Sequence, residues 1–329
     1  MLKFITTFSE EGYTKYARKM LESVKENWGE GLHLTAFYHD FDIADYDYPV
    51  SDNITYRNLN DIEDLYIFRN SNKDNDGTMG KKVPYNWRVD AIKFCHKVFG
   101  LTEYAFELAE ESKRAGWLMW LDADTLTTKP ISDKNFIPHL NPKAELVYMD
   151  RKNFEFAETS FMAFNLDYIP PLDLLGDLRG FYMSGEVTTY REWHDGYIIS
   201  RIIKMYKAHG LKAVDLTGHI DEIASHLTGP QAFDSSFLGN MMVHQKGEKK
   251  HSEYGNPDPR SSGRYKKLGD IIEYVSPKKI IEVGEWDSHR AIGSCTKAFD
   301  KNKSVTYILF NDFKNINFSK AQKLFKSYQ

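Results

Sequence analysis

The feature that most constrains this chain is an apolar run that ends abruptly in two carboxylates. Residues 117–121 read Trp-Leu-Met-Trp-Leu, and Asp122, Ala123 and Asp124 follow directly. Such a run predicts a buried central strand, and open α/β sheets bind ligands at the carboxyl ends of their strands. Because side chains i and i+2 of a strand share a face, Asp122 and Asp124 can converge on one hard cation, Mg²⁺ or Mn²⁺. The alternative is a turn with two solvated acids.

The bulk properties fit one large α/β domain with an appendage. The chain has 329 residues, 41% hydrophobic and 14% aromatic, which predicts a sizeable core. A net charge of −4 without any basic run disfavours non-specific binding to nucleic acid or membranes. Cys95 and Cys295 lie far apart, which favours free thiols and a reducing compartment. Neither a signal peptide nor a membrane-spanning run is recognisable, so we expect a cytoplasmic protein.

The amino-terminal residues predict a nucleotide-binding β-α unit. A strand is expected at residues 4–8 and a helix from Ser9 to about Lys25. The connection lacks Gly-x-Gly-x-x-Gly, which argues against a dinucleotide-binding fold. Further strands are expected at 32–38, 54–56, 145–149 and 158–165, and helices at 59–68, 84–113, from 169, and 192–207.

A second polar pattern follows a short apolar strand at residues 241–243. His244, Gly247 and Lys250 form His-x-x-Gly-x-x-Lys. A neutral imidazole would complete a mixed oxygen and nitrogen ligand set suited to Mn²⁺. The glycine would let backbone N–H groups approach a phosphate, and the lysine would neutralise a diphosphate. The alternative is a surface histidine beside a solvated lysine run.

Together, Asp122-x-Asp124 and His244-x-x-Gly247-x-x-Lys250 resemble the motifs of GT-A glycosyltransferases, specifically the glycogenin-like retaining group. The resemblance covers about residues 1–255 and implies a GT-A, Rossmann-like α/β fold with a mixed, mostly parallel sheet flanked by helices. It also implies a metal-dependent glycosyltransferase of the hexosyltransferase type. Such an enzyme moves a sugar, with retention, from a nucleotide-sugar donor, with a UDP-sugar favoured.

The resemblance implies roles for single residues on the donor side. In the glycogenin-like group, Thr-Thr followed by Tyr holds the uridine, and Thr6, Thr7 and Tyr13 match that pattern. An ordinary β-α corner, with Tyr13 packed on the sheet, fits the same residues. Arg88 and Lys93 precede the metal strand at positions where the family contacts the donor, because a departing diphosphate needs positive charge.

Three further residues are open to interpretation. Lys97 is a weaker candidate than Arg88 and Lys93, and all three basic residues could instead form a solvated helix face. Asp195 matches the family's aspartate beneath the anomeric carbon, as nucleophile or as electrostatic support, although an acid in a first helical turn is favoured regardless of function. His194 receives no role.

Residues 256–267 predict a linker, and the pattern changes beyond it. Residues 268–329 resemble the opening of an S-adenosylmethionine-dependent methyltransferase, with strands expected at 279–284 and 305–310. Glu285-Trp286-Asp287-Ser288 replaces the glycine-rich loop, and the segment is too short for such a domain. We therefore expect a small, partial α/β appendage without methyl transfer.

Other functions are compatible with parts of the sequence. A nucleotidyltransferase shares paired acids but would carry a glycine-rich loop after the first strand. A non-catalytic scaffold that binds sugar nucleotides would not need His244. A nucleic-acid acceptor is disfavoured by the negative charge, though not excluded. A glycan, lipid-linked or other small acceptor is expected, and the sequence identifies neither sugar, acceptor nor oligomeric state.

Overall fold

The computed structural model describes residues 2–78, 84–112, 114–151, 156–218 and 231–245, and the backbone of 279–283 and 306–310. The chain divides into two compact units. The first comprises Met1–Asp221 and Ala232–Gly255, and the second Glu222–Gln231 and Asn256–Gln329. The sites discussed below all lie in the first unit.

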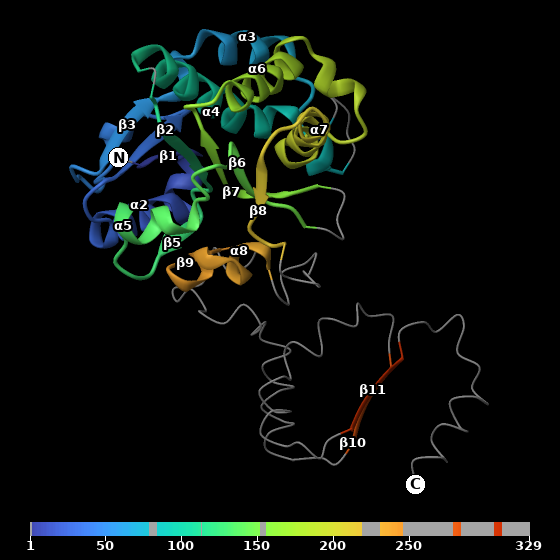
Figure 1. Cartoon of the computed structure of the whole chain (residues 1–329). Helices are drawn as coiled ribbons and strands as arrows, with labels where there is room; N and C mark the ends of the chain where they lie inside the picture. Colours follow the sequence, from blue (N-terminus) through green and yellow to red (C-terminus); the bar gives the residue numbers. More distant parts are fainter. Residues whose placement is uncertain are drawn as a thin grey trace. The chain divides into compact units, whose positions relative to one another are not determined.

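A seven-stranded sheet forms the centre of the first unit, in the order β3-β2-β1-β4-β7-β6-β8 (Figure 1). Six of the strands point one way, and β7 is antiparallel to both of its neighbours. This mixed, mostly parallel sheet confirms the expected α/β class and is consistent with a GT-A fold. The strands are β1 (Leu2–Ser9), β2 (Leu32–His39), β3 (Ile54–Asn58), β4 (Trp117–Leu121), β6 (Leu146–Met149), β7 (Glu158–Asn165) and β8 (Ala213–Asp215).

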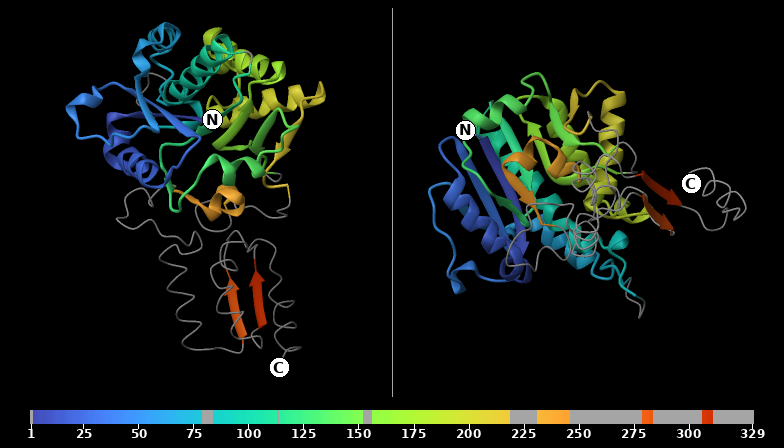
Figure 2. Two further views of the ribbon diagram at one scale, coloured as in Figure 1. Left: turned by 60° about the vertical axis from the view of Figure 1, so that its left-hand side comes forward. Right: turned by 90° about the horizontal axis from the view of Figure 1, so that it is seen from below.

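Helices cover both faces of this sheet (Figures 1 and 2). On one face lie α3 (Glu63–Ser71), α4 (Ala91–Glu111), α6 (Ile169–Met183) and α7 (Asp195–Ala208), and on the other α2 (Arg18–Asn27) and α5 (Asp133–Phe136). Short helices α1 (Glu10–Gly12) and α8 (Ala232–Ser235), a two-stranded sheet of β5 (Thr125–Thr127) and β9 (Met242–His244), and several short 3₁₀ or π-helical segments also belong to the described part of this unit.

The two layers follow from the alternation of side chains along the strands. In β1, Phe4 packs on Trp28 and Phe136, with ring centroids 4.6 and 5.5 Å away. Its neighbour Ile5 points to the opposite face and joins the core formed with α4, where Phe99 is fully buried. Because both faces are covered, β1 reads as a continuous apolar and threonine run without alternation.

Three helix boundaries differ from the sequence-based expectations. The helix expected from residue 84 begins at Ala91, because the Asp90 side chain caps it by accepting the N–H of Lys93. The helix expected from Glu192 begins at Asp195. The segment expected as one helix at 59–68 is a 3₁₀ turn, Leu59–Asp61, followed by α3.

In the second unit, two strands are described, β10 (Lys279–Val283) and β11 (Thr306–Phe310), and they pair in parallel. Both lie where strands were expected, while the likeness to a methyltransferase stays a prediction. The expected linker at 256–267 lies outside the described residues. Among the residues that the structure describes, no helix combines the length and apolar character needed to cross a bilayer.

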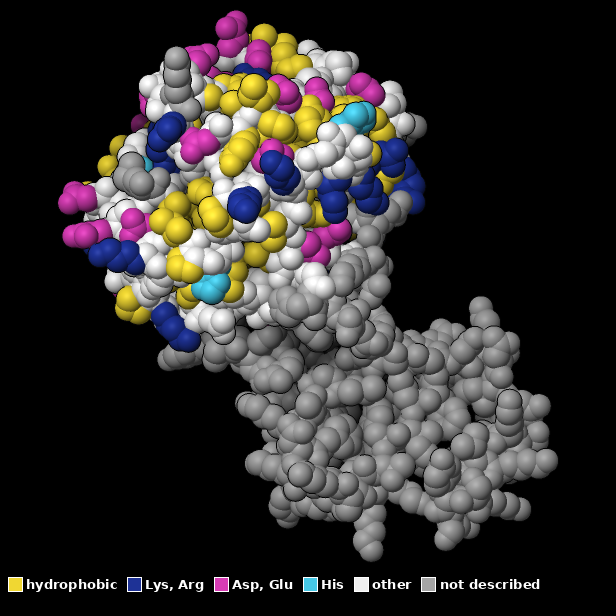
Figure 3. Space-filling model, in the orientation of Figure 1, with side chains coloured by type: hydrophobic (Ala, Val, Ile, Leu, Met, Phe, Trp, Pro, Cys, Tyr) yellow, Lys and Arg dark blue, Asp and Glu magenta, His cyan; other side chains and the backbone are white. Residues whose placement is uncertain are grey.

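The surface of the first unit is uneven in charge. In Figure 3, lysine and arginine side chains gather on the right of this unit, and acidic side chains are spread over the rest of the same face. On α7, Arg201, Lys204 and Lys207 are exposed. These residues are distant in sequence from the acidic motif.

Gly100 sets how closely α4 approaches β1. A Cβ at this position would lie 3.0 Å from Thr7 Cγ2 and 3.1 Å from Leu59 Cδ1. Gly to Ala in a helix normally stabilises by about 1 kcal/mol, but overpacking costs about 1–3 kcal/mol. We expect Gly100→Ala to lower the free energy of unfolding by roughly 1 kcal/mol in urea titrations. Gly176→Ala in α6, where no atom lies within 4 Å, should be neutral or stabilising. Equal stability of the two variants would contradict this close packing.

Candidate metal and nucleotide site

A cavity of about 480 Å³ opens at the carboxyl ends of β1, β2 and β4. It therefore lies where parallel strands of an open sheet present their loops. Sixteen residues line it, and they include acids, lysines, histidines and aromatic side chains: Thr7, Phe8, Ser9, Tyr16, His39, Trp87, Lys93, Phe94, His96, Lys97, Trp120, Asp122, Ala123, Asp124, Thr159 and Asp195.

Asp122, Asp124 and His244 meet at this cavity. Each offers one ligand atom, and the three atoms lie within 4.8 Å of one another. His244 Nε2 is 3.0 Å from Asp124 Oδ1 and 3.7 Å from Asp122 Oδ2. These separations suit neighbouring ligands around one ion with bonds of about 2.1 Å. Two carboxylates and one imidazole form a donor set that Mn²⁺ accepts, so the residues fit a divalent cation.

Backbone pairing explains how His244 reaches two acids so far away in sequence. Strand β9 pairs antiparallel with β5, and His244 lies opposite Thr125. The N–H of Gln245 also donates to the carbonyl oxygen of Asp124, at 2.8 Å. The small sheet therefore fixes the register between the two halves of the triad.

Trp120 and Lys97, which also line the cavity, support Asp122. Trp120 Nε1 donates to Asp122 Oδ1 at 2.6 Å, and Lys97 Nζ lies 3.3 Å from the same oxygen. The other oxygen of Asp122 is the one that faces His244. Hydrogen bonds of this kind orient the carboxylates that bind metals. Sequence periodicity places Trp120 in the core and gives no sign of this bond.

Lys97 also joins Asp195 to the triad. Its buried ammonium lies 2.8 Å from Asp195 Oδ2 and donates to the carbonyl oxygen of Thr159. The Thr159 hydroxyl donates to Asp195 Oδ2 at 2.8 Å. Burial acts to lower the pKa of Lys97, but Asp122 and Asp195 outweigh it and raise that pKa. Burial acts to raise the pKa of Asp195, but the charge and hydrogen bond of Lys97, with the hydrogen bond from Thr159, lower it. The pair is therefore charged.

The three residues expected near the uridine lie in different surroundings. Thr7 lines the cavity. Thr6 points to the other face of β1 and is fully buried. Tyr13 is also buried, and its hydroxyl donates to the carbonyl oxygen of Asp47. Tyr16 lines the cavity instead, because Tyr13–Ala17 forms a π-helical turn, whose wider spacing changes which residue faces inward.

Of the basic residues, Lys93 and Lys97 line the cavity. The Arg88 side chain is half exposed and lies 3.5 Å from Glu192, while its neighbour Trp87 lines the cavity. Gly247 and Lys250 lie outside the described residues. Lys97, which the sequence ranked lowest of the three basic residues, makes the closest described contacts to the acids.

At the end of β2, the rings of His39 and His96 are stacked, with centroids 3.8 Å apart and planes 8° from parallel. Burial lowers the pKa of His96 to about 3, so its ring is neutral. With Asp40 they form a second group within ligand distance. Nitrogen lone pairs lie in the ring planes, so parallel planes do not converge on one ion, and Asp40 is already paired with Arg69 at 2.8 Å. We assign no metal there.

Comparison with known proteins adds little beyond this geometry. No family model matches the chain, and no curated protein matches it. Among solved structures, it is similar to the crystal structure of mouse xyloside xylosyltransferase 1 in its apo form. The identity is 12%, the TM-score is 0.40, and the alignment covers 66% of this chain and 86% of that chain. Similarity at this level does not support a function.

Lys97→Met tests the buried ion pair. The substitution leaves Asp195 buried without its cation, and removing one partner of a buried pair typically costs about 3–5 kcal/mol. We expect a loss of that order in the free energy of unfolding, measured in urea without added metal. Lys204→Met, on the exposed face of α7, should change it by less than about 0.5 kcal/mol. A loss at Lys97 no larger than at Lys204 would show that the pair contributes nothing.

Proposed function

We propose that the first unit is a metal-dependent glycosyltransferase that takes a sugar from a nucleotide-sugar donor, with UDP as the nucleotide. The observation that carries the proposal is the meeting of Asp122, Asp124 and His244 within ligand distance, beside a cavity whose lining includes both aspartates, Lys97 and Asp195. The acceptor is a glycan, a lipid-linked sugar or another small hydroxyl compound. The resemblance in the two motifs favours retention of configuration.

The strand order supports a direction for the donor. Neighbouring strands lie about 4.8 Å apart, so the end of β2 is roughly 10 Å from the end of β4. A diphosphate held at the triad on β4 would pass Thr7 on β1 and bring its base to His39 and Tyr16. The sugar would then extend toward Asp195, on the opposite side of β4, beside β7.

The triad would hold the cation through two carboxylate oxygens and the imidazole of His244. Bound Mn²⁺ or Mg²⁺ would stabilise the negative charge that develops on the departing diphosphate. Lys93 adds positive charge within the cavity, and Gly247 and Lys250 complete the proposed donor contacts. Arg88, whose guanidinium contacts Glu192, would act at the rim.

Asp195 would stand beneath the anomeric carbon. Lys97 keeps it charged, and the Thr159 hydroxyl fixes its Oδ2 oxygen. In the transfer, the bond from the anomeric carbon to the diphosphate oxygen breaks, and the electron pair leaves with the nucleotide. An acceptor oxygen forms the new bond, and its proton passes to the departing diphosphate oxygen. The carboxylate either stabilises the positive charge of the anomeric carbon or attacks that carbon first, in which case the bond from carboxylate to sugar breaks when the acceptor oxygen attacks.

Nucleotide binding tests the proposal directly. We expect UDP, but not GDP or CDP, to raise the melting temperature when Mn²⁺ is present and not when EDTA replaces it. A ligand at a hundredfold excess over its Kd stabilises by about 2.7 kcal/mol. Asp124→Asn should abolish the shift, because the cation loses a charged ligand. Absence of a shift with every nucleotide would contradict a metal-bridged donor site.

Asp195→Asn separates chemistry from binding. The amide keeps the shape and can still accept from Thr159, but it loses the charge. We expect kcat for release of UDP from the donor to fall at least about a hundredfold, with the Mn²⁺-dependent shift by UDP unchanged. An unaltered kcat would remove Asp195 from the proposal. With the wild-type enzyme, the anomeric configuration of the product, read by NMR, decides between retention and inversion.

A further inference from the structure

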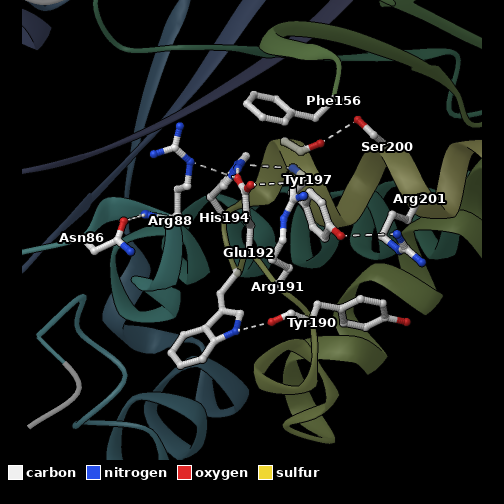
Figure 4. Close-up of polar contacts among 12 residues, drawn as sticks. Asn86, Arg88, Phe156, Tyr190, Arg191, Glu192, His194, Tyr197, Ser200 and Arg201 are labelled. Carbon is white, nitrogen blue, oxygen red and sulfur yellow. Dashed lines mark hydrogen bonds and ion pairs between the residues drawn. The ribbon is translucent and has the colours of Figure 1, made fainter. Parts of the chain in front are cut away.

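Glu192 and His194 form a buried polar pair just before α7 (Figure 4). Both side chains are more than nine-tenths buried, and His194 Nε2 lies 3.0 Å from Glu192 Oε2. Arg191 Nη2 lies 2.8 Å from Glu192 Oε1, and Arg88 Nε lies 3.5 Å from Glu192 Oε2. Burying a carboxylate is costly unless it is paired. Glu192 meets this condition through His194, Arg191 and Arg88.

The bonds of His194 fix its tautomer. Its Nδ1 accepts the backbone N–H of Tyr197 at 3.2 Å, which makes His194 the cap of α7. A nitrogen that accepts from an N–H carries no proton, so the proton of the neutral ring lies on Nε2 and is donated to Glu192. Burial lowers the pKa of His194, which keeps the ring neutral. Nδ1 therefore accepts one hydrogen bond, from Tyr197, and Nε2 donates one, to Glu192.

The ring of His194 is held on its other sides as well. Phe156 and Trp87 pack against it, with centroids 4.7 and 4.8 Å away. A Cβ on Gly196 would lie 3.3 Å from His194 Nδ1 and 3.4 Å from Cε1. The glycine therefore leaves the space in which the imidazole lies against the first turn of α7. Serine, aspartate or asparagine would cap a helix more simply, but none of them spans the distance to Glu192.

We infer that Glu192 and His194 are positioning residues for Asp195. Asp195 follows His194 directly and is the first residue of α7, so the cap sets where its backbone lies. The bond to Glu192 prevents the imidazole from turning, and the two arginines hold Glu192. Asp195 thereby meets Lys97 and Thr159 at 2.8 Å each. The inference rests on the proposed function for its kinetic consequence, but its geometry is independent of it.

Variants of Glu192 separate positioning from stability. Glu192→Gln keeps an oxygen that can accept from His194 Nε2, and Glu192→Ala removes it. We expect Glu192→Ala to lower kcat for donor hydrolysis about tenfold with the KM for donor and the Kd for UDP and Mn²⁺ unchanged. Glu192→Gln should restore most of the rate. A lower melting temperature with an unchanged kcat in Glu192→Ala would mean a structural role alone and would overturn the inference.

Gly196→Ala tests the position of the His194 ring without changing Glu192. The added methyl group displaces the ring of His194, so kcat should fall as in Glu192→Ala. Gly180→Ala in α6, where no atom lies within 4 Å of the added carbon, is the matched control and should keep wild-type kcat. Equal rates in the two alanine variants would count against the inference.

The third measurement does not depend on activity. Imidazole ¹⁵N NMR at neutral pH, assigned with His194→Asn, should show His194 with Nε2 protonated and Nδ1 bare. Loss of that signature in Glu192→Ala would support the bond to Glu192. A ring protonated on Nδ1 in the wild type would overturn the inference, whether or not a nucleotide sugar is turned over. If UDP does not bind at all, the proposed function fails while this measurement still decides the geometry.

Discussion

The site depends on one buried ammonium. Lys97 lies between Asp122 and Asp195 and so joins β4 to α7, two elements that no backbone hydrogen bond in the described residues connects. Removing an ammonium from water is costly, and two carboxylates offset that cost only when their geometry is good. The charges also determine what else can bind. Asp122, Asp124 and Asp195 contribute three negative charges to the cavity lining, and Lys93 and Lys97 contribute two positive charges. The described lining therefore keeps an excess of negative charge, which a divalent cation would offset.

The parts of the site that follow from local rules were predictable from the sequence. Asp122 and Asp124 share a side because strands have a period of two, and the apolar run before them fixed the strand. The spacing that singled out His244 was also sufficient, since the structure brings it to both acids. The short strand before His244 was expected and is β9. No feature of the sequence indicated its pairing with β5, the contact that brings His244 to the acids.

Other parts of the site depend on where a helix begins and how its first turns are wound, because these decide which side chains face the cavity. The sequence does not determine either. Arg88, Lys93 and Lys97 were all candidates. The start of α4 at Ala91 places Arg88 before the helix, while Lys93 and Lys97 lie on it and line the cavity, and Lys97 reaches Asp122. Tyr13 and Tyr16 differ for a similar reason. A π-helical turn adds a residue to the spacing, and Tyr16 lines the cavity while Tyr13 packs in the core. Such a turn has no clear sequence signal.

The contacts also favour chemistry over passive binding. A scaffold that only held a sugar nucleotide would need the triad and some positive charge near the diphosphate. It would have no use for a buried aspartate on the far side of β4, kept charged by Lys97 and fixed by Thr159. Burying the ion pair of Asp195 and Lys97 costs desolvation free energy at both residues. Glu192 and His194 form a second buried polar pair, which carries a desolvation cost of its own. Three buried polar side chains, Lys97, Glu192 and His194, arranged around one carboxylate at a cavity wall are typical of a group that must be oriented toward a reacting atom.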